Sequence, residues 1–159
     1  MIYLYIIIIL ILLLLFSKYI SNINKNIQQF NDELSNLKQN YISYTDMTDL
    51  KEKYKYLRLK IVIATNKKVS YFLNTYDNIN SLVDAFNKEY IKSELEKNRT
   101  YFDEIFTYPL DNEQRTAIIT DDDNNLIIAG AGSGKTTTII GKTRYLIDKK
   151  NIDPREIIT

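Results

Sequence analysis

The sequence contains no cysteine and no histidine. Without cysteine there is no disulfide framework and no thiolate metal site, which fits a reducing compartment. Without histidine the commonest general base is missing, so any proton transfer would fall to carboxylates or water. The formal net charge is only +1, which excludes a global electrostatic attraction to nucleic acid. The 159 residues are enough for about one domain.

Glycine is also scarce, and its placement is informative. All four glycines lie between residues 130 and 141, three of them in the stretch LIIAGAGSGKTTTII at residues 126–140. The octet from Ala129 to Thr136 has the Walker A spacing, with alanine where the strict pattern has glycine. Residues 126–129 are predicted to form a buried strand and residues 136–146 a helix. The residues expected to turn that helix towards a sheet are Ile139, Ile140, Thr143 and Ile147.

The chemistry of a triphosphate explains these residue types. Glycine lets the backbone turn successive N–H groups inward and keeps side chains away from the phosphate oxygens. The start of the following helix adds further N–H groups and its positive dipole end. Lys135 is expected to reach the β- and γ-phosphates, and the Thr136 hydroxyl to bind Mg²⁺, which makes these two the catalytic residues. The predicted ATP-binding residues of the loop are Ala129, Gly130, Ala131, Gly132, Ser133, Gly134, Lys135, Thr136 and Thr137. The alternative is a glycine-rich turn without a ligand.

The N-terminal sixteen residues, MIYLYIIIILILLLLF, carry no charge. As a helix they span roughly 24 Å, against a hydrocarbon core of roughly 30 Å. Tyr19 and Ile20 extend the run if Lys18 reaches the headgroups, so we predict a membrane anchor over residues 1–20. Lys18 and Lys25 then place the rest of the chain in the cytoplasm. A cleaved signal peptide, a buried core helix and a wholly cytoplasmic chain are the alternatives.

Residues 21–107 form a predicted helical, coiled-coil-like region. Apolar residues recur at positions 23, 27, 30, 34, 37, 41 and 44, which predicts a helix from about Asn22 to Tyr44. The sequence TDMTD at residues 45–49 shifts this phase, and a second helix is expected over residues 50–66, including the strand-like stretch KIVIAT at 60–65. Residues 69–76 and 82–106 are predicted to be helical too. The region is either an antiparallel hairpin or stalk, or a self-associating coiled coil.

The stretch YPLDNEQRTAIITDDDNNLIIAGAGSGKTTTIIGKTRYLI begins at Tyr108. Asp111 or Asn112 can cap the short helix that follows. The stretch resembles the opening of the UvrD/Rep-type helicases of superfamily one, in particular helicase IV-like members. The resemblance covers about residues 108–159 and includes the AGAGSGKT loop residue for residue. It implies that Gln114 hydrogen-bonds adenine, and that the parent is a RecA-like motor coupling ATP hydrolysis to 3′→5′ translocation on single-stranded DNA.

The expected fold is an α-rich N-terminal part, with a membrane-anchor helix and a helical stalk or hairpin, followed by the start of an α/β RecA-like P-loop NTPase domain at residues 108–159. No hydrophobic run ending in Asp-Glu follows the loop, and the Asp103-Glu104 pair lies before it. We therefore expect the N-terminal portion of a longer protein or a truncated gene product, which binds ATP but hydrolyses it poorly alone. Single-stranded DNA would bind through the missing parts of the motor.

Two other functions stay open at this point. One is a membrane-anchored helical interaction protein with a vestigial, non-hydrolysing phosphate loop. The other is a different membrane-tethered P-loop ATPase, against which Gln114 argues, because that adenine contact is a helicase feature.

Overall fold

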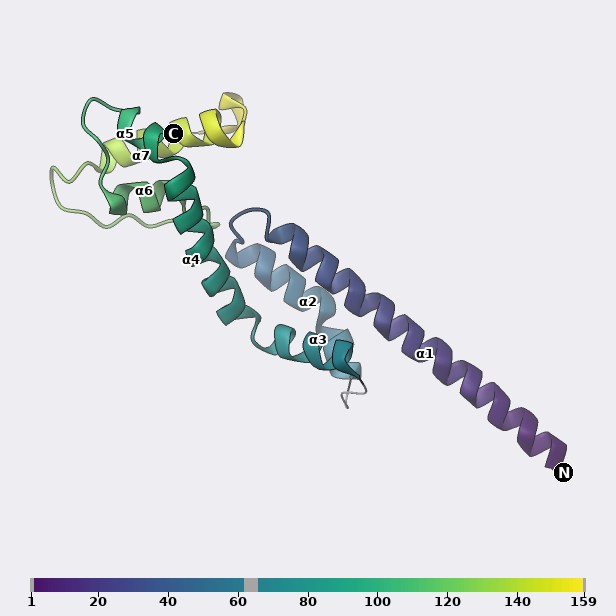
Figure 1. The fold of residues 1–159 in the computed structure, drawn as a ribbon. Coiled ribbons are helices and arrows are strands. Elements are labelled where there is room, and N and C mark those ends of the chain that lie inside the picture. Colours follow the sequence, from purple (N-terminus) through teal and green to yellow (C-terminus); the bar gives the residue numbers. More distant parts are fainter. Residues whose placement is uncertain (1, 62–65, 159) are drawn as a thin grey trace. The chain divides into compact units, whose positions relative to one another are not determined.

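The computed structural model describes residues 2–61 and 66–158, and every regular element in them is helical (Figure 1). The helices are α1 (Ile2–Leu37), α2 (Tyr44–Lys60), α3 (Lys67–Asp77), α4 (Ile79–Lys97), α5 (Arg99–Glu104), α6 (Asn112–Ile119), α7 (Lys135–Lys150) and the 3₁₀ turn η1 (Pro154–Glu156). They divide into two compact units. Unit 1 holds the described residues up to 39 and residues 46–82, and unit 2 holds residues 40–45 and the described residues from 83 onwards.

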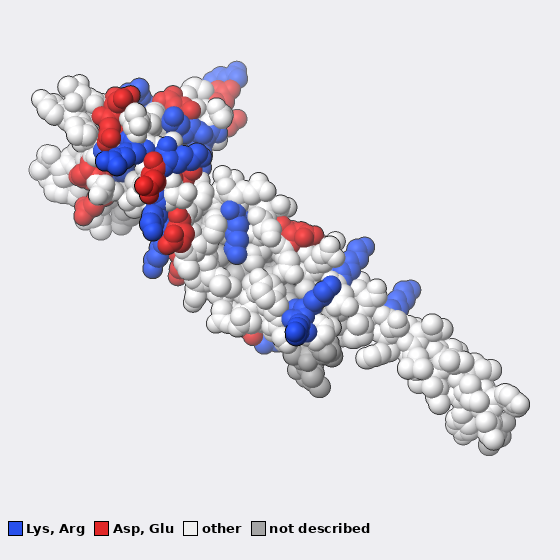
Figure 2. Space-filling view, in the orientation of Figure 1, with Lys and Arg blue, Asp and Glu red and all other residues white. Residues whose placement is uncertain are grey.

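The N-terminal half of α1 packs against none of the other described residues of unit 1. Every side chain from Ile2 to Phe16 is exposed, by 45% to 82%, and this half projects beyond α2 and α3 (Figure 1). In Figure 2, the face in view of the N-terminal end of α1 carries no charged side chain. A helix that is apolar all round needs an apolar surrounding, and the described residues of unit 1 do not supply one for this end of α1.

The second half of α1 supplies the core of unit 1. Its buried residues Ile23, Ile27, Phe30 and Leu34 occupy the predicted heptad positions. Phe30 is fully buried, with its ring edge-on to Tyr54 of α2 at 5.2 Å and to Phe72 of α3 at 5.0 Å between centroids. The heptad stripe is therefore used for packing within the chain.

The boundaries of the first helices differ from the prediction. The first helix ends at Leu37 rather than at Tyr44, and Tyr44 begins α2 instead. The cause is a tertiary contact in unit 2, where the buried Asn87 side chain accepts from Ile42 N at 3.0 Å and donates to Ile42 O at 2.9 Å. These bonds use the backbone groups that a continuing helix would pair. The expected break at residues 45–49 lies inside α2, which ends at Lys60, and residues 62–65 of KIVIAT lie outside the described residues.

Unit 2 is built on the packing of α6 against α7. Its core contains Phe102, Ile105, Leu110, Ile118, Ile119 and Tyr145. The two helices approach closely at Gly141, where an added Cβ would lie 2.6 Å from Ile118 Cδ1. Glycine at this position therefore sets the distance between the helix that carries Gln114 and the helix that follows the phosphate loop.

The predicted strand at residues 126–129 is not formed in the described part of the chain. Leu126 and Ile128 are 85% and 87% exposed, and no described segment pairs with their backbone. A strand obtains its hydrogen bonds from a neighbour, so an apolar composition alone does not create one. Of the predicted sheet face of α7, Ile139 and Ile140 are exposed and Thr143 and Ile147 are half-buried, and the described residues form no sheet against it. The buried face consists of Thr138, Gly141 and Tyr145.

Candidate nucleotide-binding site

The glycine-rich loop has a backbone suited to an anion. Gly132 and Gly134 have φ angles of +78° and +81°, a left-handed conformation that only glycine adopts cheaply. Gly134 is the N-cap of α7, and the first intrahelical bond runs from Thr138 N to Gly134 O at 2.9 Å. The N–H groups of residues 135–137 thus have no partner within the helix and face its open end. An added Cβ at Gly130 or Gly132 would meet nothing within 4 Å, so the loop backbone is open to a ligand.

The loop is closed on itself by hydrogen bonds. Ser133 Oγ donates to Gly130 O at 2.8 Å, and the Ser133 N–H donates to the same oxygen at 3.4 Å. The Lys135 ammonium donates to Ala129 O at 2.6 Å and to Gly130 O at 2.8 Å. The cation that is expected to meet phosphate is therefore already positioned over the loop, on carbonyl oxygens that an anionic ligand can replace.

The remaining predicted loop residues lie around this closed turn. Ala131 is exposed at its tip, Thr136 is exposed in the first turn of α7, and Thr137 is half-buried beside it. Thr136 is thus accessible for the expected Mg²⁺ contact. Within the described residues there is no group of three or more acidic side chains arranged to hold a metal ion.

The structure brings Gln114 to the loop. Asp111 caps α6 by accepting from Gln114 N at 2.8 Å, and Gln114 Oε1 accepts from Asp111 N at 3.0 Å, which completes a capping box. The other end of the amide, Nε2, donates to Ser133 O at 3.3 Å. A Cβ at Gly134 would lie 2.4 Å from this nitrogen. Gln114 therefore packs directly on the loop, although it lies fifteen residues before Ala129 in the sequence.

A cavity of about 320 Å³ opens beside the loop. Besides predicted site residues, its lining includes Asp111, Glu113, Ala117 and Thr138, which sequence reasoning had not placed in the site. The spacing of Asp111 and Gln114 is the capping-box signature and could have revealed the first of them. The side chain of Thr138 was not predictable, because its burial depends on how α7 packs against α6.

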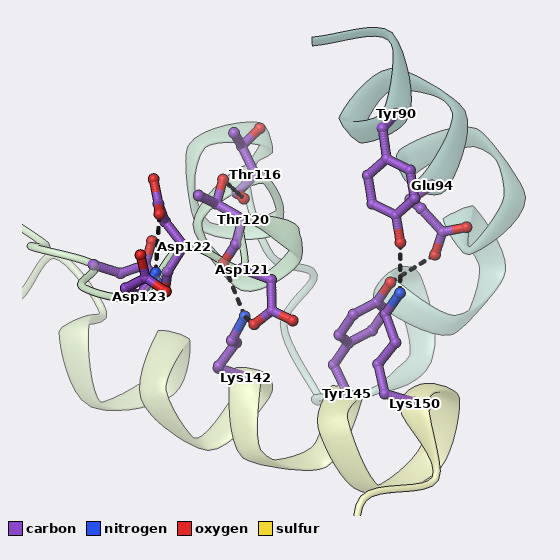
Figure 3. A network of polar contacts seen from close by, with 11 residues as sticks. Tyr90, Glu94, Thr116, Thr120, Asp121, Asp122, Asp123, Lys142, Tyr145 and Lys150 are labelled. Atoms are coloured by element: carbon purple, nitrogen blue, oxygen red, sulfur yellow. Dashed lines mark hydrogen bonds and ion pairs between the residues drawn. The ribbon is translucent and has the colours of Figure 1, made fainter. Parts of the chain in front are cut away.

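Polar contacts hold α7 in place behind the loop (Figure 3). Lys142 donates to Thr120 O and pairs with Asp121, both at 2.8 Å, which connects α7 to the end of α6. Tyr145 donates to Glu94 of α4 at 2.6 Å, and burial together with this bond raises the pKa of Tyr145. These contacts come from side chains about two and three helical turns beyond the start of α7. They fix the direction in which the helix N-terminus points.

A glycine loop that leads into a helix, with a lysine over the turn, is the arrangement of a phosphate-binding loop. Residues 110–159 match the family described as the UvrD/REP helicase N-terminal domain. The chain is similar to a probable DNA helicase II homolog of Mycoplasma capricolum, with 51% identity over 49 residues, 31% of this chain and 7% of the relative.

Two further relatives are similar to part of the chain. DNA helicase IV of Escherichia coli is 28% identical over 72 residues, 45% of this chain and 10% of that protein. The ATP-dependent DNA helicase PcrA of Staphylococcus epidermidis is 41% identical over 49 residues, 31% of this chain and 7% of that protein. The chain thus spans a tenth or less of these relatives. No solved structure matches it. The resemblance to UvrD/Rep-type helicases that the sequence predicted is thus confirmed by the family match over residues 110–159.

Proposed function

We propose that residues 108–159 are the ATP-binding segment of a UvrD-like ATP-dependent DNA helicase. The observation that carries the proposal is the contact between Gln114 and the phosphate loop, at 3.3 Å from Nε2 to Ser133 O. The helicase resemblance assigns Gln114 to the adenine and the loop to the phosphates of one nucleotide, and this contact brings the two together. Both lie inside the segment that matches the helicase family. Coupling of ATP hydrolysis to 3′→5′ movement on single-stranded DNA belongs to the same proposal.

Each residue has a defined part in nucleotide binding. The N–H groups of the loop and of the first turn of α7 donate to the phosphates. Lys135 exchanges the carbonyl oxygens of Ala129 and Gly130 for phosphate oxygens, and Thr136 contributes its hydroxyl to Mg²⁺. Gln114 exchanges its bond to Ser133 for one to adenine. We expect slow hydrolysis by the 159-residue chain alone, since no acidic pair follows its loop.

Binding of a fluorescent ATP analogue with Mg²⁺ tests this proposal. The Lys135→Ala variant should lose most of its affinity, because it removes a charge-assisted contact to phosphate. Thr136→Ala should weaken binding only when Mg²⁺ is present. Lys88→Ala is the matched control, since Lys88 is an exposed lysine of α4 that lies outside the site. Equal affinity of the original chain and Lys135→Ala would contradict the proposal and favour a vestigial loop in a helical interaction protein.

We further propose that α1 anchors the chain in a membrane. A window of 18 residues in α1 has a mean hydropathy of 2.5, and none of it is buried. Residues 2–20 span roughly 28 Å as a helix, close to the hydrocarbon thickness. With Lys18 at the end of the span and Lys25 after it, the rest of the chain lies in the cytoplasm.

Membrane fractionation with an alkaline carbonate wash tests the anchor. The original chain should stay in the pellet and be released by detergent. Leu10→Arg with Leu13→Arg should move it to the supernatant, because charged side chains at the centre of a span cost about 2.5–3.5 kcal/mol each. Both leucines are exposed, so unit 1 should keep its fold. Ser35→Arg with Ser81→Arg adds the same charge elsewhere, and loss of that control from the membrane would contradict the assignment.

The absence of cysteine makes orientation directly measurable. Single-cysteine variants Tyr3→Cys and Ser35→Cys can be treated with a membrane-impermeant maleimide in intact cells. Only Tyr3→Cys should react from outside. Labelling of Ser35→Cys instead would show that the orientation is reversed.

A further inference from the structure

The membrane anchor and the core of unit 1 belong to one uninterrupted helix. α1 runs from Ile2 to Leu37, and its first buried residue, Ile23, follows directly after the proposed span. Lys25 lies only about 7.5 Å further along the axis than Ile20. The headgroup layer of one leaflet is roughly 5–8 Å thick. The following inference rests on the proposed anchor, because that anchor places this end of unit 1 among the lipid headgroups.

A cavity of about 640 Å³ lies at this level of unit 1. Lys25 and Gln28 of α1 line one side of it, and Lys67, Lys68 and Tyr71 of α3 line the other. Its size is in the range of small-ligand sites. The cavity is therefore large enough for a phospholipid headgroup.

The charge of the cavity is of one sign. None of its described lining residues is acidic. Some lysines elsewhere in the described chain pair with carboxylates, as Lys53 does with Glu33 at 2.7 Å and Lys142 with Asp121 at 2.8 Å. By contrast, no described carboxylate lies within ion-pair distance of the three cavity lysines. Three exposed, unpaired cations facing one space favour an anion there.

Two further features of the walls point to the same kind of ligand. The N-terminus of α3, capped by Asn66, lies at the cavity and adds its positive dipole end. Asn24 also lines the cavity, and its Oδ1 is buried without a hydrogen-bond partner among the described residues. The ionised phosphodiester of a lipid cannot supply a donor to this oxygen, whereas a headgroup hydroxyl can. A phosphodiester that carries hydroxyl groups therefore suits the cavity: its phosphate pairs with the lysines, and a hydroxyl donates to Asn24 Oδ1.

We propose that the cavity between α1 and α3 binds the headgroup of an anionic phospholipid of the phosphatidylglycerol type. The phosphate lies between Lys25, Lys67 and Lys68, and the glycerol hydroxyls lie towards Asn24. Basic pockets at the cytoplasmic face of membrane helices recognise anionic headgroups in this way. Bound lipid would fix α3 to the membrane surface as well as α1.

The test uses the full chain purified in a non-ionic detergent with equal amounts of phosphatidylcholine and phosphatidylglycerol. Native mass spectrometry counts each lipid on the protein. The original chain should carry mainly phosphatidylglycerol. Lys67→Gln with Lys68→Gln should reduce this preference by about 25-fold, at about fivefold for each lysine near an anionic surface. Lys67→Arg with Lys68→Arg should retain it.

The matched control is Lys88→Gln with Lys92→Gln, which removes the same charge from two exposed lysines of α4. An equal loss in both double variants would overturn the proposal, because general charge would then explain the preference. Displacement of the lipid by an equal concentration of inorganic phosphate would overturn it too, by revealing a site for free anions. If the original chain stays in the membrane pellet but shows no lipid preference, only the headgroup site fails. If it is soluble, the anchor itself fails.

Discussion

The contact between α6 and α7 offers a sharp test, because it sets the position of Gln114 on the phosphate loop. The perturbation is Gly141→Ala. The new Cβ would lie 2.6 Å from Ile118 Cδ1 and 3.5 Å from the ring of Phe106. Ile118 is fully buried, so its side chain has little room in which to move. The substitution therefore has two opposite effects on stability: alanine favours the helix, and its methyl group overpacks the contact with Ile118.

The two contributions have opposite signs. Replacing a helical glycine by alanine stabilises a helix by about 1 kcal/mol. Overpacking a core by one methyl group costs about 1–3 kcal/mol. We expect a net destabilisation of about 0–2 kcal/mol. Ile118→Val removes the opposing Cδ1 and alone costs about 0.5–1.5 kcal/mol. In the double variant Gly141→Ala with Ile118→Val the overlap disappears. Its destabilisation should therefore be about 1–2 kcal/mol smaller than the sum of the two single-variant destabilisations.

Hydrogen exchange read by mass spectrometry reports on α6 and α7 separately from unit 1. Each 1.4 kcal/mol lost should raise exchange about tenfold in these helices. Gly130→Ala is the matched control, since its Cβ would meet nothing within 4 Å. The reasoning is refuted if Gly141→Ala and Ile118→Val combine additively, because the two groups would then not compete for the same space. If the single variant Gly141→Ala also binds the ATP analogue more weakly, the packing of α6 against α7 affects nucleotide binding.

Three further predictions concern single contacts. Asp111→Ala removes the cap of α6 and should cost about 1 kcal/mol, seen as faster exchange in α6. Phe30→Ala empties the core of unit 1 and should cost about 3–5 kcal/mol, measured by exchange in α3. Burial raises the pKa of Glu94, but hydrogen bonds from Tyr145 and Lys97 outweigh it and hold the pKa below the ordinary 4.5. Its contribution to stability should be complete above pH 4.5, decline as pH falls through the lower folded pKa, and be absent from Glu94→Gln.

Local patterns in the sequence predicted a good part of the helices and the residues of the glycine-rich turn. The heptad stripe located the buried face of α1 at Ile23, Ile27, Phe30 and Leu34. The glycine spacing located the loop, and a capping residue was expected before α6, where Asp111 lies. Such features depend on residues close together in the chain. The match to the helicase family over residues 110–159 includes the same loop and capping residue.

Contacts between distant residues decided the rest. The turn after α1 is held by Asn87, 45 residues away from Ile42, and no local signal indicates it. Residues 126–129 have the composition of a strand, yet a strand needs a paired neighbour, and the described chain supplies none.

The buried face of α7 and the closed state of the loop also came from the tertiary structure. Glycine at position 141 lets Ile118 reach the helix surface, which turns Ile139 outward. The loop carbonyls hold Lys135, and the capped start of α6 brings Gln114 to Ser133. The sequence alone determined which residues form the loop and the apolar helix, because spacing and composition are local properties. Only the folded chain decided what those residues touch, because packing joins segments that the sequence keeps apart.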